Sequence, residues 1–262
     1  MFATKYFWIA QINFKTSLAY IFDIIGSSAF IAIIIFVFIN LWSVIYADRT
    51  LVFGLTLPMM IWYLVFTETM VTSTGKLVQE IGEEVKKGEI ANYLNKPYHY
   101  LAYKYSKTLG STIFSFLITL AIAGTIAFIF VGPIQINPMH IPFIAIAALL
   151  GLAIYFIMSA LLGIFAFWIE DAKAIEFIYS KILFTIGGML APLEIWPQFI
   201  ADVSKLLPFS LTAYYPAKLF VAFSFDIFIN VIILEIFWIT VLVGITLLLF
   251  NIFSKKISIN GG

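Results

Sequence analysis

Long uncharged runs alternate with short charged segments along the chain. No formal charge falls between Asp23 and Asp48, and from Thr108 to Ile169 there is no Asp, Glu, Lys or Arg. A helix needs about 20 apolar residues to cross the hydrocarbon core of a bilayer, so the first run fits one crossing and the second fits two. Helix-breaking residues divide the second run, at Gly132, Pro133, Asn137, Pro138 and Pro142.

The pattern predicts six transmembrane helices, at 24–46, 51–70, 108–131, 142–168, 174–191 and 228–253. The fifth is the weakest, because Glu176 and Lys181 fall in its first half. If both termini are cytoplasmic, all of the 15 basic residues lie on that side except Arg49, Lys205 and Lys218. The positive-inside rule therefore predicts cytoplasmic N and C termini.

Composition narrows the class of protein further. Hydrophobic residues make up 63% of the 262 residues and charged residues 11%, which excludes a water-soluble globular enzyme. With 15 basic and 14 acidic residues, the chain lacks the positive surplus of a nucleic-acid binder. It has no cysteine, and Ser159 has no histidine or lysine spaced to activate it. We expect an all-α integral membrane protein, one transmembrane domain over 1–262, with no metal site and no catalytic residue.

The N-terminal residues 1–20 alternate aromatic and apolar side chains with polar ones. Lys5, Gln11, Asn13 and Lys15 interrupt a segment that contains Trp8 and its aromatic neighbours. This pattern is typical of a helix lying in the headgroup plane of the bilayer. A simple aromatic anchor is the alternative.

Residues 76–98 form the most water-soluble part of the chain. Leu77, Ile81 and Val85 recur every four residues, and the charged residues lie between them. The spacing predicts a short amphipathic helix that stops at Gly88. Such a helix is either a charge-rich connector or a docking surface for a cytoplasmic partner.

The outer segment 192–216 is rich in proline and aromatic residues. It contains four prolines, one tryptophan and two tyrosines, at Pro192, Trp196, Pro197, Pro208, Tyr214, Tyr215 and Pro216. They favour broken half-helices that dip back into the outer leaflet, which is possible where protein or a cavity satisfies the freed backbone groups. An interfacial aromatic belt is the alternative.

This arrangement resembles the permease subunit of a bacterial type-2 ABC transporter over nearly the whole chain. Residues 88–98, G-E-I-A-N-Y-L-N-K-P-Y, are similar to the stretch G-x-I-A-x-Y-L-x-x-P-Y of a branch related to drug and viologen exporters. Residues 191–197, A-P-L-E-I-W-P, with L-P-F at 207–209 and Y-P at 215–216, resemble that branch's pattern P-L-x-x-x-P, L-P-F and Y-x-P.

The resemblance implies a transport subunit without enzymatic activity in the cytoplasmic (inner) membrane. Two separate ABC ATPase subunits, which carry ATP and Mg²⁺, would drive it. A second permease, identical or homologous, would complete a path that exports an apolar or amphipathic substrate. The chain itself has no phosphate-binding loop, since Gly75 and Lys76 are followed by Leu77, and position 70 is Met70. We therefore expect no cofactor on this chain.

The resemblance also implies three sets of site residues. The ATPase-coupling set is Leu77, Ile81, Glu83, Glu84, Val85, Lys86, Lys87, Gly88, Glu89 and Ile90, with Glu170 and Asp171 as a smaller second contact. The outer-gate set is Pro192, Leu193, Trp196, Pro197 and Pro208. The substrate-path set is Trp62, Tyr63, Phe66, Phe184 and Met189, although aromatic residues and Met on helices more often serve packing.

Two acids inside the expected spans are the basis of an alternative function, ion-coupled secondary transport. Glu68 and Glu235 are functional candidates, because an unpaired charge in the bilayer is costly. Each is either a protonated acid hydrogen-bonded across the bundle or part of an ion-coupled secondary transporter. The absence of an evident internal repeat argues against a secondary transporter.

Overall fold

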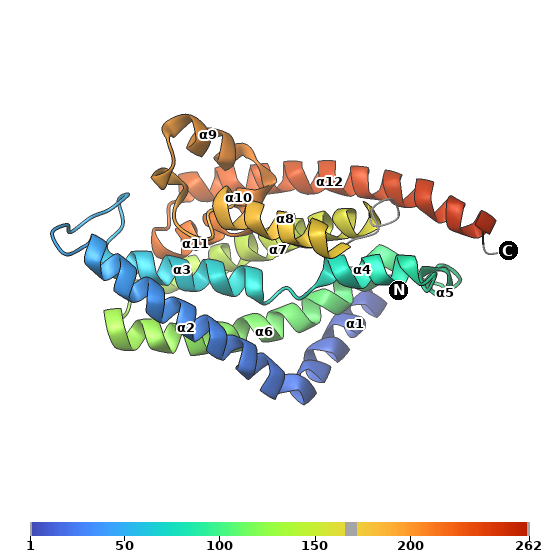
Figure 1. Ribbon diagram of the computed structural model, residues 1–262, viewed down its shortest axis with the longest axis horizontal. Helices are drawn as coiled ribbons and strands as arrows, with labels where there is room; N and C mark the ends of the chain where they lie inside the picture. Colours follow the sequence, from blue (N-terminus) through green and yellow to red (C-terminus); the bar gives the residue numbers. More distant parts are fainter. Residues whose placement is uncertain (1, 166–171, 261–262) are drawn as a thin grey trace.

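The computed structural model describes residues 2–165 and 172–260, and the elements in these ranges are helical. The only extended pairing there is a single bridge between Val52 and Leu55. Figure 1 shows an elongated bundle whose long helices run roughly along its long axis. The loop at 46–56 lies at one end, and α4 (Leu77–Lys86), α5 (Ile90–Leu94) and both ends of the chain lie toward the other.

Four segments of the described chain are long and apolar enough to cross a membrane. They are Thr4–Ile45, Tyr100–Val131, Pro138–Phe165 and Phe225–Phe253. The first covers most of α1 (Phe2–Ser17), a 3-10 turn (Leu18–Tyr20) and α2 (Ile21–Ile45), and the second is α6 (Tyr100–Val131). The third is a 3-10 turn (Pro138–His140) with α7 (Ile141–Phe165), and the fourth is the larger part of α12 (Phe225–Asn260). The expectation of an all-helical, multi-pass membrane protein is confirmed.

The second and fifth expected crossings correspond to shorter helices. α3 (Leu57–Thr72) has 16 residues and α8 (Ala172–Thr185) has 14, about 24 and 21 Å at 1.5 Å per residue. α3 begins later than the expected position 51, because the chain turns at Gly54 and the Thr56 hydroxyl caps the helix. α8 ends at Thr185, before the expected position 191. Just after it, Gly188 has a φ of +77° and turns the chain.

The N-terminal helix α1 packs against α6 and meets α2 at an angle, as Figure 1 shows. The two helices approach so closely that a Cβ on Gly110 would lie 2.1 Å from the carbonyl oxygen of Ala10. The backbone amide of His99 also donates to the Tyr6 hydroxyl at 3.1 Å. The face of α1 turned away from these contacts exposes Phe7, Trp8 and Ile12.

The segment after α8 forms four short helices. They are a 3-10 turn (Leu193–Ile195), α9 (Gln198–Leu206), α10 (Pro208–Thr212) and α11 (Tyr214–Val221). α10 and α11 pack against α7, and α11 also packs against α3. Gly151 of α7 makes room for α10, because a Cβ there would lie 2.5 Å from the carbonyl oxygen of Leu211. α10 and α11 therefore belong to the core of the bundle, whereas α9 exposes Phe199, Val203 and Leu206.

Candidate functional site

The apolar face of α4 is buried inside the chain. Leu77, Ile81 and Val85 belong to the core, and α4 packs against α7 and α8. A Cβ on Gly163 of α7 would lie 2.8 Å from the Cβ of Ile81, so α4 rests almost directly on the α7 backbone. This face of the amphipathic helix is used for internal packing and is not open to a partner.

α4 is also joined to α6 by an ionic cluster in which Lys104 and Glu84 are buried and Glu80 and Lys107 are partly exposed. Lys104 is 1% exposed, and its Nζ donates to Oε1 of Glu80 at 2.7 Å and to Oε1 of Glu84 at 2.6 Å. Lys107 Nζ donates to the same oxygen of Glu80 at 2.6 Å. The Tyr100 hydroxyl donates to Oε2 of Glu84 at 2.6 Å. Two ammonium groups thus match two carboxylates, and such matching offsets the cost of removing the charges from water.

Aromatic rings extend the cluster to α5 and α12. The Tyr100 ring stacks on Phe250 of α12, with centroids 5.7 Å apart and planes 2° from parallel. Tyr93 of α5 packs edge-on against Tyr100 at 5.6 Å, and the Lys104 ammonium lies 5.8 Å from the Tyr93 ring. These contacts hold α4, α5, α6 and α12 together at one end of the bundle.

The cluster sets the ionisation of its members. Burial acts to raise the pKa of Glu80, but hydrogen bonds from Lys104 and Lys107 outweigh it and hold the pKa below its ordinary value. Glu80 is therefore ionised at neutral pH.

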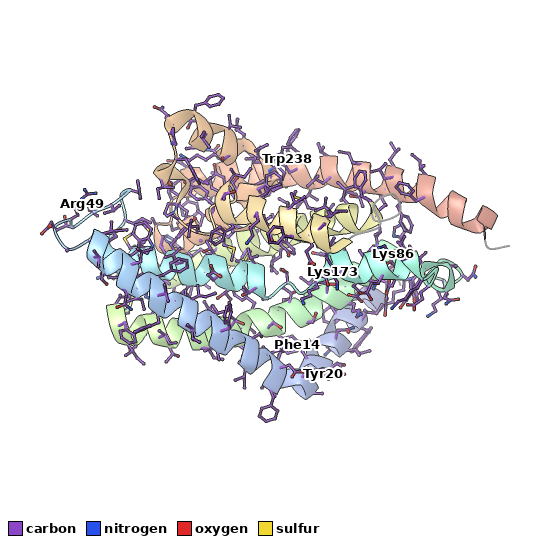
Figure 2. All side chains as sticks on the ribbon, viewed as in Figure 1. Phe14, Tyr20, Arg49, Lys86, Lys173 and Trp238 are labelled. Atoms are coloured by element: carbon purple, nitrogen blue, oxygen red, sulfur yellow. The ribbon has the colours of Figure 1, made fainter. Side chains whose placement is uncertain are left out.

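The exposed part of α4 and the turn after it carry the remaining members of the expected coupling set. Glu83, Lys86, Lys87, Gly88 and Glu89 are exposed, whereas Glu84 and Ile90 are buried. Gly88 has a φ of +68° and ends α4. Figure 2 labels Lys86 at the end of the molecule opposite Arg49. Glu170 and Asp171, the expected second contact, lie outside the described residues.

A second ionic cluster lies on the opposite end of the bundle, in the outer segment. Oε1 of Glu194 accepts from the Tyr214 hydroxyl at 2.6 Å and from Lys218 Nζ at 2.5 Å, and Lys205 Nζ lies 3.6 Å away. Burial acts to raise the pKa of Glu194, but Lys218 and Tyr214 outweigh it and lower the pKa. The cluster joins the 3-10 turn to α9 and α11.

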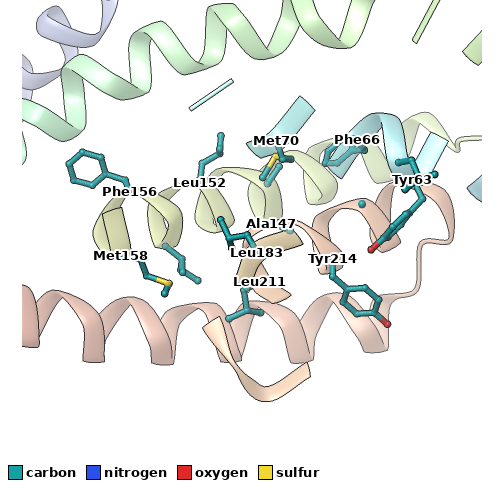
Figure 3. Packing of buried hydrophobic residues seen from close by; sticks show 14 of the residues in the cluster. Tyr63, Phe66, Met70, Ala147, Leu152, Phe156, Met158, Leu183, Leu211 and Tyr214 are labelled. Carbon is teal, nitrogen blue, oxygen red and sulfur yellow. The ribbon is translucent and has the colours of Figure 1, made fainter. Parts of the chain in front are cut away.

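Four of the expected outer-gate residues flank Glu194 in sequence, and the fifth, Pro208, begins α10. Pro192, Leu193 and Pro208 are buried, Trp196 is half-buried and Pro197 is exposed. Tyr63 of α3 reaches the same region, since its hydroxyl donates to the carbonyl oxygen of Gly188 at 2.5 Å. Figure 3 shows Tyr63 and Tyr214 beside each other, and their ring centroids are 6.4 Å apart.

The expected substrate-path residues divide into buried and half-buried ones. Tyr63 and Phe66 are buried, and the Phe66 ring stacks on Phe220 at 4.6 Å, so both serve packing in this conformation. Trp62, Phe184 and Met189 are half-buried. The indole of Trp62 donates to the carbonyl oxygen of Gly132 at 2.9 Å.

Comparison with known proteins identifies the family. The model of the family described as ABC-2 family transporter protein matches residues 31–261, most of the chain. The chain belongs to the ABC-2 transporter family. A search of curated proteins finds no match. Membership makes the chain a membrane permease, a transport component that associates with ATPase subunits rather than a catalytic subunit.

Both acids that fall inside the expected spans of the permease are buried. Glu68 on α3 is 2% exposed and Glu235 on α12 is 0% exposed. Neither carboxylate oxygen of Glu235 has a hydrogen-bond partner among the described residues. A buried carboxyl without a partner is costly as an anion, so it favours the protonated form.

Sequence reasoning missed the pairings that build the permease's two ionic clusters. Lys104 lies 24 residues from Glu80 and 20 from Glu84, and Lys218 lies 24 from Glu194. At such separations no local periodicity indicates a contact. The one available signal was that Lys104 and Lys107 stand next to a long uncharged run, where a paired lysine is cheaper than a free one.

We predict that Lys104→Met destabilises the permease by about 3–5 kcal/mol, because it leaves the Glu84 carboxylate buried without its cation. The matched control is Lys87→Met, whose pairing with Glu83 at 3.4 Å is exposed. The control should change stability by less than about 1 kcal/mol. Denaturant unfolding in detergent measures both, and equal losses in the two variants would contradict the cluster's role.

The outer cluster predicts a pH-dependent effect of Glu194→Gln. Because the folded pKa of Glu194 is lowered, its ionised form adds stability above the unfolded pKa of about 4.3. That stability is lost as pH falls through the folded pKa. The variant should melt below the unaltered protein at pH 7, and the gap should close on acidification below about pH 4.3. Asp202→Asn, at an exposed position of α9, is the control; a gap for Glu194→Gln that is independent of pH would refute the assignment.

Proposed function

We propose that this permease forms, with a second identical or homologous permease, an export path driven by two separate ABC ATPase subunits. The observation that carries the proposal is the ionic cluster of Lys104 with Glu80 and Glu84, which fixes α4 to the bundle while its charged face stays exposed. A rigid, exposed element at one end of a permease suits the transfer of motion from a partner.

The coupling surface follows from burial. Because Leu77, Ile81 and Val85 are used internally, the ATPase contacts would be made by the exposed residues of the expected set. These are Glu83, Lys86, Lys87, Gly88 and Glu89, with Glu170 and Asp171 as the second contact. ATP and Mg²⁺ would bind the ATPase subunits, and this chain would hold no cofactor.

Motion would pass from this surface to the outer segment through stiff helices. α6 has 32 residues and is joined to α4 at its cytoplasmic end. α7 contacts α4 near its C-terminal end, at Gly163, and α10 near its middle, at Gly151. Packed interfaces move as discrete bodies rather than deforming continuously, so closure of the ATPases would shift both helices. The residues Pro192 to Pro208 would then act as the outer gate.

The topology that suits this mechanism has six crossings and cytoplasmic termini. α2, α3, α6, α7, α8 and α12 would cross the cytoplasmic (inner) membrane of a bacterium, with α1 at the headgroup level. α3 and α8 are short for the roughly 30 Å hydrocarbon core, so the turns beside them would complete their crossings. The segment 192–216 would re-enter the outer leaflet, where α10 and α11 are covered by α3 and α7.

The substrate would be apolar or amphipathic, as the branch related to drug and viologen exporters suggests. Trp62, Phe184 and Met189 are the expected path residues that remain partly accessible. Tyr63 and Phe66 would reach the path only if α3 moves relative to α11. The aromatic and thioether surfaces of this set suit an apolar molecule.

The proposal predicts that reversing the exposed charges of α4 releases the ATPase. A permease with Lys86→Glu and Lys87→Glu should lose most of the ATPase in a pull-down from detergent, while its own melting temperature changes little. Arg49→Glu, an exposed reversal at the opposite end, should retain the ATPase. Retention by the double variant would count against the coupling surface.

A transport assay distinguishes an ATP-driven permease from an ion-coupled secondary transporter. Changing the hydrolytic glutamate of the ATPase should stop transport in vesicles that contain the complex. Transport that survives this change and collapses with an uncoupler would favour a secondary transporter using Glu68 and Glu235.

A further inference from the structure

α8 presents an exposed face that carries a lysine. Phe177, Lys181 and Thr185 are exposed and recur every four residues, so they lie on one side of the helix. On the other side, Tyr179 and Leu183 are buried against the bundle. The exposed face therefore combines an aromatic ring, an ammonium group and a hydroxyl within a helix proposed to cross the membrane.

Lys181 lies well inside this helix. It is nine residues after Ala172, about 13 Å along the axis, and four residues before the end at Thr185. Its ammonium lies 5.0 Å from the Phe177 ring and 5.9 Å from the Phe184 ring. An ammonium held beside two rings on an exposed face of a crossing helix needs water or a counter-charge.

The described residues supply no carboxylate to Lys181. The nearest acid along α8, Glu176, bonds instead to the side-chain amide of Gln79 on α4. The lysines of the two ionic clusters differ in this respect, since Lys104 has Glu80 and Glu84, and Lys218 has Glu194. Within the part of the chain that the structure describes, Lys181 carries a positive charge that no acid neutralises.

We propose that Lys181 binds the anionic group of the transported molecule, while Phe177 and Phe184 contact its apolar part. The inference rests on the proposed function, in which α8 lines the path, and it specifies the substrate class as an amphipathic anion with a carboxylate, phosphate or sulfonate group. An ammonium binds such a group through a charge-assisted hydrogen bond, and the rings bury the adjoining apolar surface. A dication such as a viologen would meet a like charge here, so the site distinguishes this chain from a viologen exporter.

The chain contains no cysteine, so one introduced thiol reports on this face alone. We would place Thr185→Cys in the full complex with its ATPase, in phosphatidylcholine nanodiscs, with and without ATP. The probes are the anionic 2-sulfonatoethyl and the cationic 2-(trimethylammonio)ethyl methanethiosulfonates. The introduced cysteine lies one helical turn from Lys181, so the ammonium should favour the anionic reagent. The ratio of anionic to cationic labelling rates should therefore fall at least about fivefold when Lys181→Gln is added. Lys15→Gln, an exposed lysine on α1, should leave the ratio unchanged.

A protection arm tests the ligand class directly. The aromatic anion 2-naphthoate should slow labelling of Thr185→Cys, and the matched cation 2-naphthylmethylammonium should not. Lys181→Gln should abolish the protection and Lys181→Arg should retain it, which separates charge recognition from a structural effect of the substitution.

Several outcomes would overturn the proposal. Thr185→Cys that resists both reagents in both nucleotide states would show that lipid or a second copy of the chain covers the face. Equal protection by the anion and the cation would exclude charge recognition. Loss of naphthoate protection in nanodiscs rich in phosphatidylglycerol would assign Lys181 to lipid headgroups. A permease that fails to retain its ATPase would refute the proposed function. Labelling of Thr185→Cys does not require ATP hydrolysis, so the labelling and protection experiments could still be interpreted in that case.

Discussion

The structure depends on the neutralisation of a lysine that is almost wholly buried. Lys104 stands where α6 leaves the uncharged run, and at 1% exposure its charge is tolerable only because Glu80 and Glu84 face it. Both acids lie on α4, so pairing the lysine also fixes α4 against α6. The close approach of Ile81 to Gly163 then fixes α4 against α7. A requirement of electrostatics thus gives the end of the bundle that carries α4 its rigidity.

At the opposite end of the bundle, an ion pair again joins separate helices, although between different elements. Glu194 neutralises Lys218 and accepts from Tyr214, and these contacts join short helices that have little stability of their own. Between the two ends the polar contacts involve uncharged groups, such as the bond between the Ser28 and Thr119 hydroxyls, and Glu235 has no hydrogen-bond partner in the described chain. An ABC-2 permease built in this way has its ionic clusters at its two ends and mainly apolar packing between them.

The fold class and the family could be predicted from sequence because they depend on local or composition-level signals. Uncharged runs, Gly132 and the proline clusters mark long helices and their ends without reference to distant residues. The start of α3 depends on a cap at Thr56 and a turn at Gly54, which hydropathy does not detect. For the candidate site, periodicity found the amphipathic helix at Leu77 but not the direction in which its apolar face points. That direction depends on Gly163, far along the chain, and the ion pairs of Lys104 likewise join residues 20 or more positions apart.

The central claim is that α4 and α6 move as one body when the ATPases close. Electron paramagnetic resonance can test it with spin labels at two exposed positions outside the coupling surface, Lys76 at the N-cap of α4 and Leu117 on α6. The distance distribution is measured in the assembled complex, without nucleotide and with ATP trapped. We predict a single narrow distribution that stays the same in both states. A distribution that shifts or broadens on ATP binding would show that α4 moves independently, and the rigid coupling proposed for this permease would be wrong.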